Sequence, residues 1–224
     1  MQPIVIVILV AVVLFAISFH ESAHAWTALK FGDPTARDLG RISLNPIRHI
    51  DPFGTVLLPL IMIFLHQPPF GYAKPTPVNL RNTARPRLAN FWISAAGPLS
   101  NLVVVFSCAL ILIVFGRVAP ENLARASNLG APGILAPIVF IVTQMIAINL
   151  VLCIFNLIPV PPMDGSGILF SALGRRGLAI EMFFHRYSFV MFILIMVLVR
   201  AGVFGAILNP AVRFVENLIQ MGIG

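Results

Sequence analysis

Charged residues are scarce in this chain. Only 10% of its 224 residues are Asp, Glu, Lys or Arg, whereas 58% are hydrophobic and the mean hydropathy is +0.95. A soluble domain averages roughly 25% charged residues, so this composition excludes an ordinary soluble enzyme. No segment has the size and composition of a separate soluble domain. We therefore expect one membrane-embedded domain over residues 1–224, with a core at 4–173 and a C-terminal span and tail at 180–224.

Cysteine is also scarce, and the charge is mostly of one sign. Cys108 and Cys153 both fall in apolar runs, which argues against a disulfide or a cysteine metal site and favours small buried side chains. The formal net charge is +7, but the basic residues are scattered between hydrophobic runs. That distribution is typical of loops beside a membrane. We expect the lipid bilayer as a partner and no nucleic acid.

Long hydrophobic runs are what the sequence does contain. A helix needs about 20 mostly apolar residues to cross a bilayer. The pattern predicts an all-α polytopic membrane protein with about four full transmembrane helices, at residues 4–28, 88–115, 133–158 and 187–208. The run at 53–65 would be only about 20 Å long as a helix, which favours a re-entrant segment. We expect a short interfacial helix in the tail at 209–224.

The first hydrophobic run contains ionisable residues in the pattern HESAH. An ionised side chain at mid-membrane costs roughly 2.5–3.5 kcal/mol, so such groups persist when they have partners or a function. His20 and His24 lie one turn apart on the same face of a helix. They can bind one zinc ion, with Glu21 beside it as the general base.

A catalytic zinc site usually has three protein ligands and leaves a fourth position for water. Asp164 is the favoured third ligand, because it follows an apolar run and a proline cluster where an aspartate needs a positive partner. An N-cap of the next helix or an exposed loop residue remain alternatives for Asp164. Other acidic and histidine side chains lie in or near the loops and at the last span: Asp33, Asp38, His49, Asp51, His66, Glu121, Glu181, His185 and Glu216.

Three motifs in order resemble the site-2 protease family of zinc intramembrane proteases. They are HESAH, the sequence Gly97-Pro98-Leu99-Ser100-Asn101, and Asn156-x-x-Pro159-x-x-x-x-Asp164-Gly165. The resemblance implies that His20, His24 and Asp164 bind one Zn²⁺ per chain and that Glu21 is the base. It also implies that Asn156 lies near the metal, where its amide could bond the substrate carbonyl. The chain looks like a minimal form, without the inserted peptide-binding or C-terminal nucleotide-sensing domain of many relatives.

Predictions can also be made for the segment at 70–77 and for the middle motif. Residues 70–77 resemble a membrane-associated loop or hairpin that in this family helps to hold an extended substrate. Within the middle motif, Asn101 is expected either to bond between helices or to act in catalysis, and Gly97 to allow close helix packing.

A shared metal ion also constrains the topology. Both histidines lie near the C-terminal end of the first span, and Asp164 lies just past the C-terminal end of the span at 133–158. These two spans must therefore run in the same direction, which requires the segment at 53–65 to dip in and return. The basic segments then share one side, which is the cytoplasm by the positive-inside rule. We expect an outside N-terminus, an active site toward the cytoplasm and, for so small a chain, a prokaryotic cell membrane.

Together these features predict a zinc-dependent intramembrane endopeptidase that cuts transmembrane protein substrates with a metal-activated water. A catalytically inactive scaffold with a structural zinc site and a transporter are the alternatives. A transporter would spread its charged residues over several spans, and an inactive scaffold would be expected to lose Glu21 first. A different membrane zinc protease would take a glutamate as third ligand, and the candidates for it are Glu121, Glu181 and Glu216.

Overall fold

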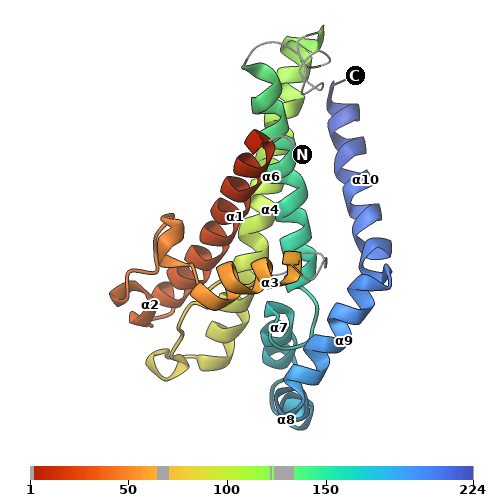
Figure 1. Ribbon diagram of the computed structural model, residues 1–224. Coiled ribbons are helices and arrows are strands. Elements are labelled where there is room, and N and C mark those ends of the chain that lie inside the picture. Colours follow the sequence, from red (N-terminus) through yellow and green to blue (C-terminus); the bar gives the residue numbers. More distant parts are fainter. Residues whose placement is uncertain (1–2, 65–70, 122, 124–133, 224) are drawn as a thin grey trace.

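The computed structural model describes residues 3–64, 71–121, 123 and 134–223, and every regular element in these ranges is a helix (Figure 1). The long elements are α1 (Pro3–Lys30), α4 (Pro86–Val118), α6 (Leu135–Asn156) and α10 (Val203–Ile223). The short ones are α2 (Thr35–Asp38), η1 (Pro46–Arg48), η2 (Pro52–Leu57), α3 (Leu58–Phe64), η3 (Leu80–Asn82), α7 (Asp164–Leu173), η4 (Gly174–Gly177), α8 (Leu178–Arg186) and α9 (Ser188–Arg200). The all-α prediction is confirmed.

Among the residues that the structure describes, three helices are long and apolar enough to cross a membrane: α1, α4 and α6. They match the first three predicted spans, so the chain is an integral membrane protein. The main core cluster joins α4 and α6 and includes Val105, Ala109, Leu112 and Leu150. Both cysteines are free and buried, as expected for small apolar side chains.

The helices of this bundle alternate in direction. In Figure 1, α1 and α6 run down the view and α4 runs up between them. The last residues of α1 and α6 therefore lie toward the same end of the bundle, as the prediction of a shared metal ion required. This end also carries α2 and α7, and the polar residues of the motifs gather there.

The predicted short segment forms a π-helical turn, η2, followed by α3. Asp51 starts it by accepting hydrogen bonds from the backbone N–H groups of Phe53 (3.0 Å) and Gly54 (2.7 Å). In Figure 1, α3 runs crosswise to α1 and α4 rather than along them. A piece this short does not reach across about 30 Å of hydrocarbon. Its re-entrant path through a bilayer stays a prediction.

The C-terminal part differs from the expected span at 187–208 and short tail helix. The chain breaks after α9 at Gly202, whose φ is +83°, and the helical axes on either side differ by 65°. A positive φ suits glycine and ends a helix. From Val203 one helix then continues through the expected tail, and its Val215 joins the main core cluster. The tail is thus the second half of α10, and the described ranges contain up to four possible spans if the bent pair counts as one.

Candidate metal centre

Three predicted ligands come together at the end of the bundle. His20 and His24 lie on the face of α1 that is buried against α4, and Asp164 is the first residue of α7. The Nε2 atoms of the two histidines are 3.1 Å apart. Oδ2 of Asp164 lies 3.2 Å from Nε2 of His20 and 3.4 Å from Nε2 of His24. In the described ranges, no other group of three His, Cys, Asp or Glu side chains could hold a metal ion.

The spacing of these three atoms fits zinc. Ligands bound at 2.0–2.2 Å in a tetrahedral array lie about 3.3–3.6 Å from one another, and the three distances here, 3.1, 3.2 and 3.4 Å, are close to the short end of that range. Electron pairs of two imidazoles and a carboxylate would repel one another at this distance without a positive charge between them. Oδ2 of Asp164 is also buried without a hydrogen-bond partner in the described part of the chain.

Gly97 of α4 leaves the space that a metal ion would need. A Cβ atom at Gly97 would lie 2.3 Å from Nε2 of His24 and 2.6 Å from Nε2 of His20, far closer than ordinary contact. The sequence suggested that Gly97 allows helices to pack closely. In the structure, the atoms that come close to Gly97 are the Nε2 atoms of the two predicted histidine ligands.

Hydrogen bonds to the other ring nitrogens orient the histidines. Nδ1 of His24 lies 2.6 Å from the carbonyl oxygen of Ile93, which can only accept, so Nδ1 carries the hydrogen and Nε2 keeps a free electron pair. Nδ1 of His20 lies 3.2 Å from the side-chain nitrogen of Asn101. Asn101 Oδ1 is buried and has no partner among the described residues. If the amide is turned by half a turn, Oδ1 instead accepts a hydrogen bond from the Nδ1–H of His20. Asn101 thus bonds between helices, from α4 to α1.

Asp164 begins α7 rather than capping it. Met163 occupies the N-cap position, and no side chain caps the helix there, so the N-cap alternative is wrong. Gly165 lets α7 start against the end of α6, because a Cβ at Gly165 would lie 2.3 Å from the carbonyl oxygen of Leu157.

The far end of α7 is held by side chains of α4. Arg87 donates hydrogen bonds to the carbonyl oxygens of Ser171 and, at 2.7 Å, Ala172. The Asn90 amide donates to the Ser171 hydroxyl at 2.9 Å. A cation at the C-terminal carbonyls of a helix is favourable. These bonds fix the helix that carries Asp164, and the sequence analysis did not identify Arg87 or Asn90.

The side chain of the predicted base Glu21 is hydrogen-bonded to a residue from a distant loop. Its Oε2 accepts a hydrogen bond from the backbone N–H of Thr76 (3.0 Å) and lies 2.8 Å from the Thr76 hydroxyl. Thr76 belongs to the segment 70–77 that the sequence linked to substrate, and Phe70 lies outside the described residues. The sequence pattern gave no signal for a bond between this segment and Glu21.

Asn156 is the last residue of α6. Its amide nitrogen donates to the carbonyl oxygen of Leu152, one turn earlier, at 3.0 Å. An amide nitrogen has two hydrogens, so one remains for a substrate. The predicted role of Asn156 at the substrate carbonyl stays a prediction.

The loop candidates for the third ligand have other partners where the structure describes them. Asp38 pairs with Arg37, and Asp51 starts η2. His49 is buried, with its Nε2 2.7 Å from the carbonyl oxygen of Ser43. His66 lies outside the described residues. Asp33 is fully buried, and hydrogen bonds from Thr35, Asn79 and Asn82 hold the pKa of its carboxyl below the usual range even though burial alone would raise it.

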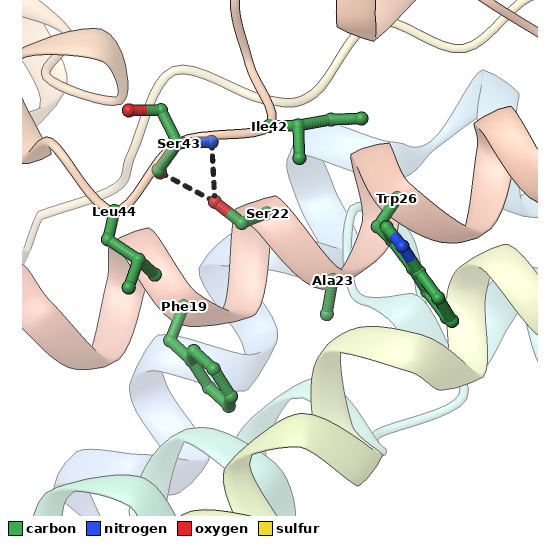
Figure 2. Close-up of a pocket in the computed structure, with 7 residues that line it drawn as sticks. All are labelled: Phe19, Ser22, Ala23, Trp26, Ile42, Ser43 and Leu44. Carbon is green, nitrogen blue, oxygen red and sulfur yellow. Dashed lines mark hydrogen bonds between the residues drawn. The ribbon is translucent and has the colours of Figure 1, made fainter.

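A groove of about 410 Å³ runs beside the HESAH motif (Figure 2). Ser22, next to Glu21, donates from its hydroxyl to the carbonyl oxygen of Ser43 (2.6 Å) and accepts from the Ser43 N–H (3.2 Å). The remaining lining is apolar: Phe19, Ala23, Trp26, Ile42 and Leu44. The groove contains none of the candidate ligands. The Ser22–Ser43 bonds tie the loop after α2 to the helix that carries the motif.

Comparison with known proteins gives one family. The model of peptidase family M50 matches residues 7–199, which is most of the chain. YwhC of Bacillus subtilis, named as a candidate zinc metalloprotease, is 39% identical over 190 residues, covering 84% of this chain and 80% of its own length. Rip2 of Mycolicibacterium smegmatis, named in the same way, is 29% identical over 167 residues, which are 74% of this chain and 57% of Rip2. No solved structure matches the chain.

Proposed function

Because the chain belongs to peptidase family M50, the site-2 protease family, we propose that this metalloprotease is a zinc-dependent intramembrane endopeptidase. It would bind one zinc ion through His20, His24 and Asp164 and cut transmembrane protein substrates. YwhC and Rip2 carry names that describe zinc metalloproteases, which agrees with the choice of metal.

The observation that carries this proposal is the cluster of ligand atoms inside a membrane bundle. Two nitrogens and one carboxylate oxygen lie 3.1–3.4 Å apart. The histidines belong to α1, a helix of 28 residues that is long enough and apolar enough to span a bilayer. Burying these polar groups is costly unless they share a cation. Glu21, the proposed general base, directly follows His20 in the sequence.

The residues of the chain divide the chemistry between them. Zinc bound at this site would supply Lewis-acid polarisation of a water molecule and of the substrate carbonyl. Glu21 takes a proton from the attacking water and delivers it to the leaving amine. Asn156, with the amide hydrogen that its helix leaves free, donates to the oxyanion, and losing such a donor typically costs about 3–4 kcal/mol.

A transmembrane substrate must unwind before it is cut, because a helix hides its peptide bonds in internal hydrogen bonds. Residues 71–77 could hold the unwound strand by backbone pairing. Three of their N–H groups already bond within the protein: Tyr72 to Gly54 O (3.1 Å), Lys74 to His49 O (2.9 Å) and Thr76 to Glu21 Oε2 (3.0 Å). Pro75 and Pro77 have no N–H. Pairing would therefore rely mainly on substrate N–H groups that donate to carbonyl oxygens of this segment.

The topology proposed for this enzyme places the active site toward the cytoplasmic side of a prokaryotic cell membrane. The parallel course of α1 and α6 supports it (Figure 1). So does the concentration of Lys and Arg in the segments 31–51, 67–87 and 159–186.

The test compares the wild type with Glu21→Gln in detergent, using a panel of single-span membrane peptides. Glutamine keeps the size of the side chain but is not a base, so we expect zinc content to be kept and cleavage to be lost. His24→Ala is the companion variant, in which both zinc and cleavage should fall. Equal cleavage by Glu21→Gln would remove Glu21 from its role, and zinc content unaffected by His24→Ala would refute the metal site.

A further inference from the structure

We propose that Thr76 is a positioning residue that holds one oxygen of the Glu21 carboxylate, so that the other oxygen carries the proton during hydrolysis. This inference rests on the proposed function of Glu21 as the base. It assigns a role to Thr76 that differs from contact with substrate, because Thr76 acts through Glu21. Residues 72–79, which carry Thr76, are called the strap below.

The contacts between Thr76 and Glu21 are concentrated on one carboxylate oxygen. The Thr76 N–H donates to Oε2 at 3.0 Å. The Thr76 hydroxyl has one hydrogen and two acceptors within reach, Oε2 at 2.8 Å and the Glu21 carbonyl oxygen at 3.0 Å. Among the described residues, Oε1 of Glu21 has no such donor in the structure, which leaves it as the oxygen that can exchange a proton.

The strap is fixed on both sides of Thr76. Before it, the N–H of Lys74 donates to the carbonyl oxygen of His49 at 2.9 Å. After it, the N–H of Asn79 donates to Oδ2 of the fully buried Asp33 at 2.6 Å, and the Asn82 amide donates to Oδ1 at 2.8 Å. Asp33 follows α1, the same helix that carries Glu21. The strap is thus anchored to the frame in which Glu21 sits.

The neighbours of Thr76 in the sequence restrict its backbone further. Pro75 and Pro77 fix their own φ angles, and each proline also restricts the residue before it. The Thr76 N–H therefore points at Glu21 from a stiff segment. A donor held in this way limits the rotation of the long glutamate side chain, which keeps the base in reach of the reacting groups.

The effect of losing the hydroxyl follows from the usual strength of a hydrogen bond to a charged group, which corresponds to a factor of about 10–100. In Thr76→Val the shape and the N–H stay and the hydroxyl is lost. We expect kcat to fall about tenfold or more, with KM and zinc content near those of the wild type. Thr76→Ser restores the hydroxyl and should recover most of kcat.

Thr83 offers a matched control in the same loop region. Its hydroxyl donates to the carbonyl oxygen of Leu80 at 2.7 Å, and the residue is buried. Thr83→Val makes the same chemical change without touching Glu21, so kcat should stay near that of the wild type. If Thr76→Val and Thr83→Val lower kcat equally, or if serine at position 76 fails to rescue, the positioning role is refuted.

A second measurement does not depend on activity. Between Pro75 and Pro77, Thr76 carries the one backbone N–H, and hydrogen exchange followed residue by residue by NMR measures this group separately from its neighbours. In Glu21→Ala the acceptor is gone, and exchange at Thr76 should speed up. Exchange at Lys74, whose acceptor is His49, should not change. Unchanged exchange at Thr76 would refute the contact.

The two measurements separate the failure of this inference from the failure of the proposed function. A wild type that cuts no membrane peptide would count against the protease, while faster exchange at Thr76 in Glu21→Ala would still support the contact. A wild type that cuts, with a Thr76→Val variant of equal kcat, would count against Thr76 alone.

Discussion

Replacing Gly97 by alanine should close the metal site without unfolding the helix that bears it. The new Cβ would lie 2.3 Å from Nε2 of His24, about 1.1 Å short of ordinary contact at 3.4 Å. It would also lie 2.5 Å from Cε1 of His20. Because α4 is a long packed helix, the imidazole rings are the parts that must retreat.

The size of the effect follows from this overlap. A functional zinc site tolerates about 0.2 Å of variation in its bond lengths. A ring displaced by about 1 Å therefore no longer binds an ion that its partners keep in place. Loss of supporting contacts alone weakens metal binding 10–100-fold, so we expect Gly97→Ala to weaken zinc binding at least about 100-fold, or about 2.7 kcal/mol.

The assay is competition for zinc against a chelating dye in detergent, with helix content followed by circular dichroism. Gly205→Ala in α10 is the matched control, because no atom of the described residues lies within 4 Å of a Cβ at that position. It should bind zinc as the wild type does. If Gly97→Ala kept the zinc affinity of the wild type with its helices intact, the space in front of Gly97 would not be the metal site.

Three further predictions test the surroundings of the site. Asn101→Asp, which can still accept from His20 Nδ1–H, should keep zinc, whereas Asn101→Leu should weaken it about 10–100-fold; equal loss in both would show that the amide donates instead. Because the pKa of Asp33 is lowered in the folded protein, its carboxylate stabilises the fold at pH values above the usual aspartate pKa of about 4. This contribution is lost as the pH falls through the lower pKa of the folded state. The free energy of unfolding should therefore depend less on acid pH in Asp33→Asn than in the wild type. In intact cells, an impermeant thiol reagent should reach Ile134→Cys but not Arg81→Cys, and the reverse labelling would invert the proposed topology.

The meeting of the three candidate ligands could be predicted because these residues leave strong marks in the sequence. His20 and His24 are one turn apart in an apolar run, and Asp164 follows a proline cluster at the end of another. An ion shared by these residues also predicts the parallel course of α1 and α6 (Figure 1). Ionisable side chains are costly to bury in an apolar bundle unless they have partners, so they limit the arrangements that the helices can adopt. For this reason the predicted parallel course of α1 and α6 agrees with the structure.

The contacts that position these residues could not be predicted in the same way. The bonds from Thr76 to Glu21 and from Arg87 to α7 depend on how loops and helices far apart in the sequence meet. A threonine between two prolines or an arginine near a helix start is common and has many other uses. Gly97 was singled out, but a glycine does not reveal from its sequence which atoms approach it.

The C-terminal error has a local cause. The sequence Arg200-Ala201-Gly202 carries the usual marks of a helix end, a basic last turn followed by glycine. The apolar residues continue past Gly202, and the predicted span was extended with them to residue 208. The tail was expected to begin at Asn209, yet residues 209–223 lie inside α10.

The position of Asp164 at the start of α7 bears on how the protein is made. A nascent chain that ends at Met163 has both histidines and the glutamate of the motif but lacks the carboxylate that completes the proposed zinc site. Even after Asp164 emerges, α7 is fastened only when Ser171 and Ala172 reach Arg87. Biosynthesis itself would then delay proteolysis until most of the bundle has been inserted, and no removable inhibitory segment would be needed for this safeguard.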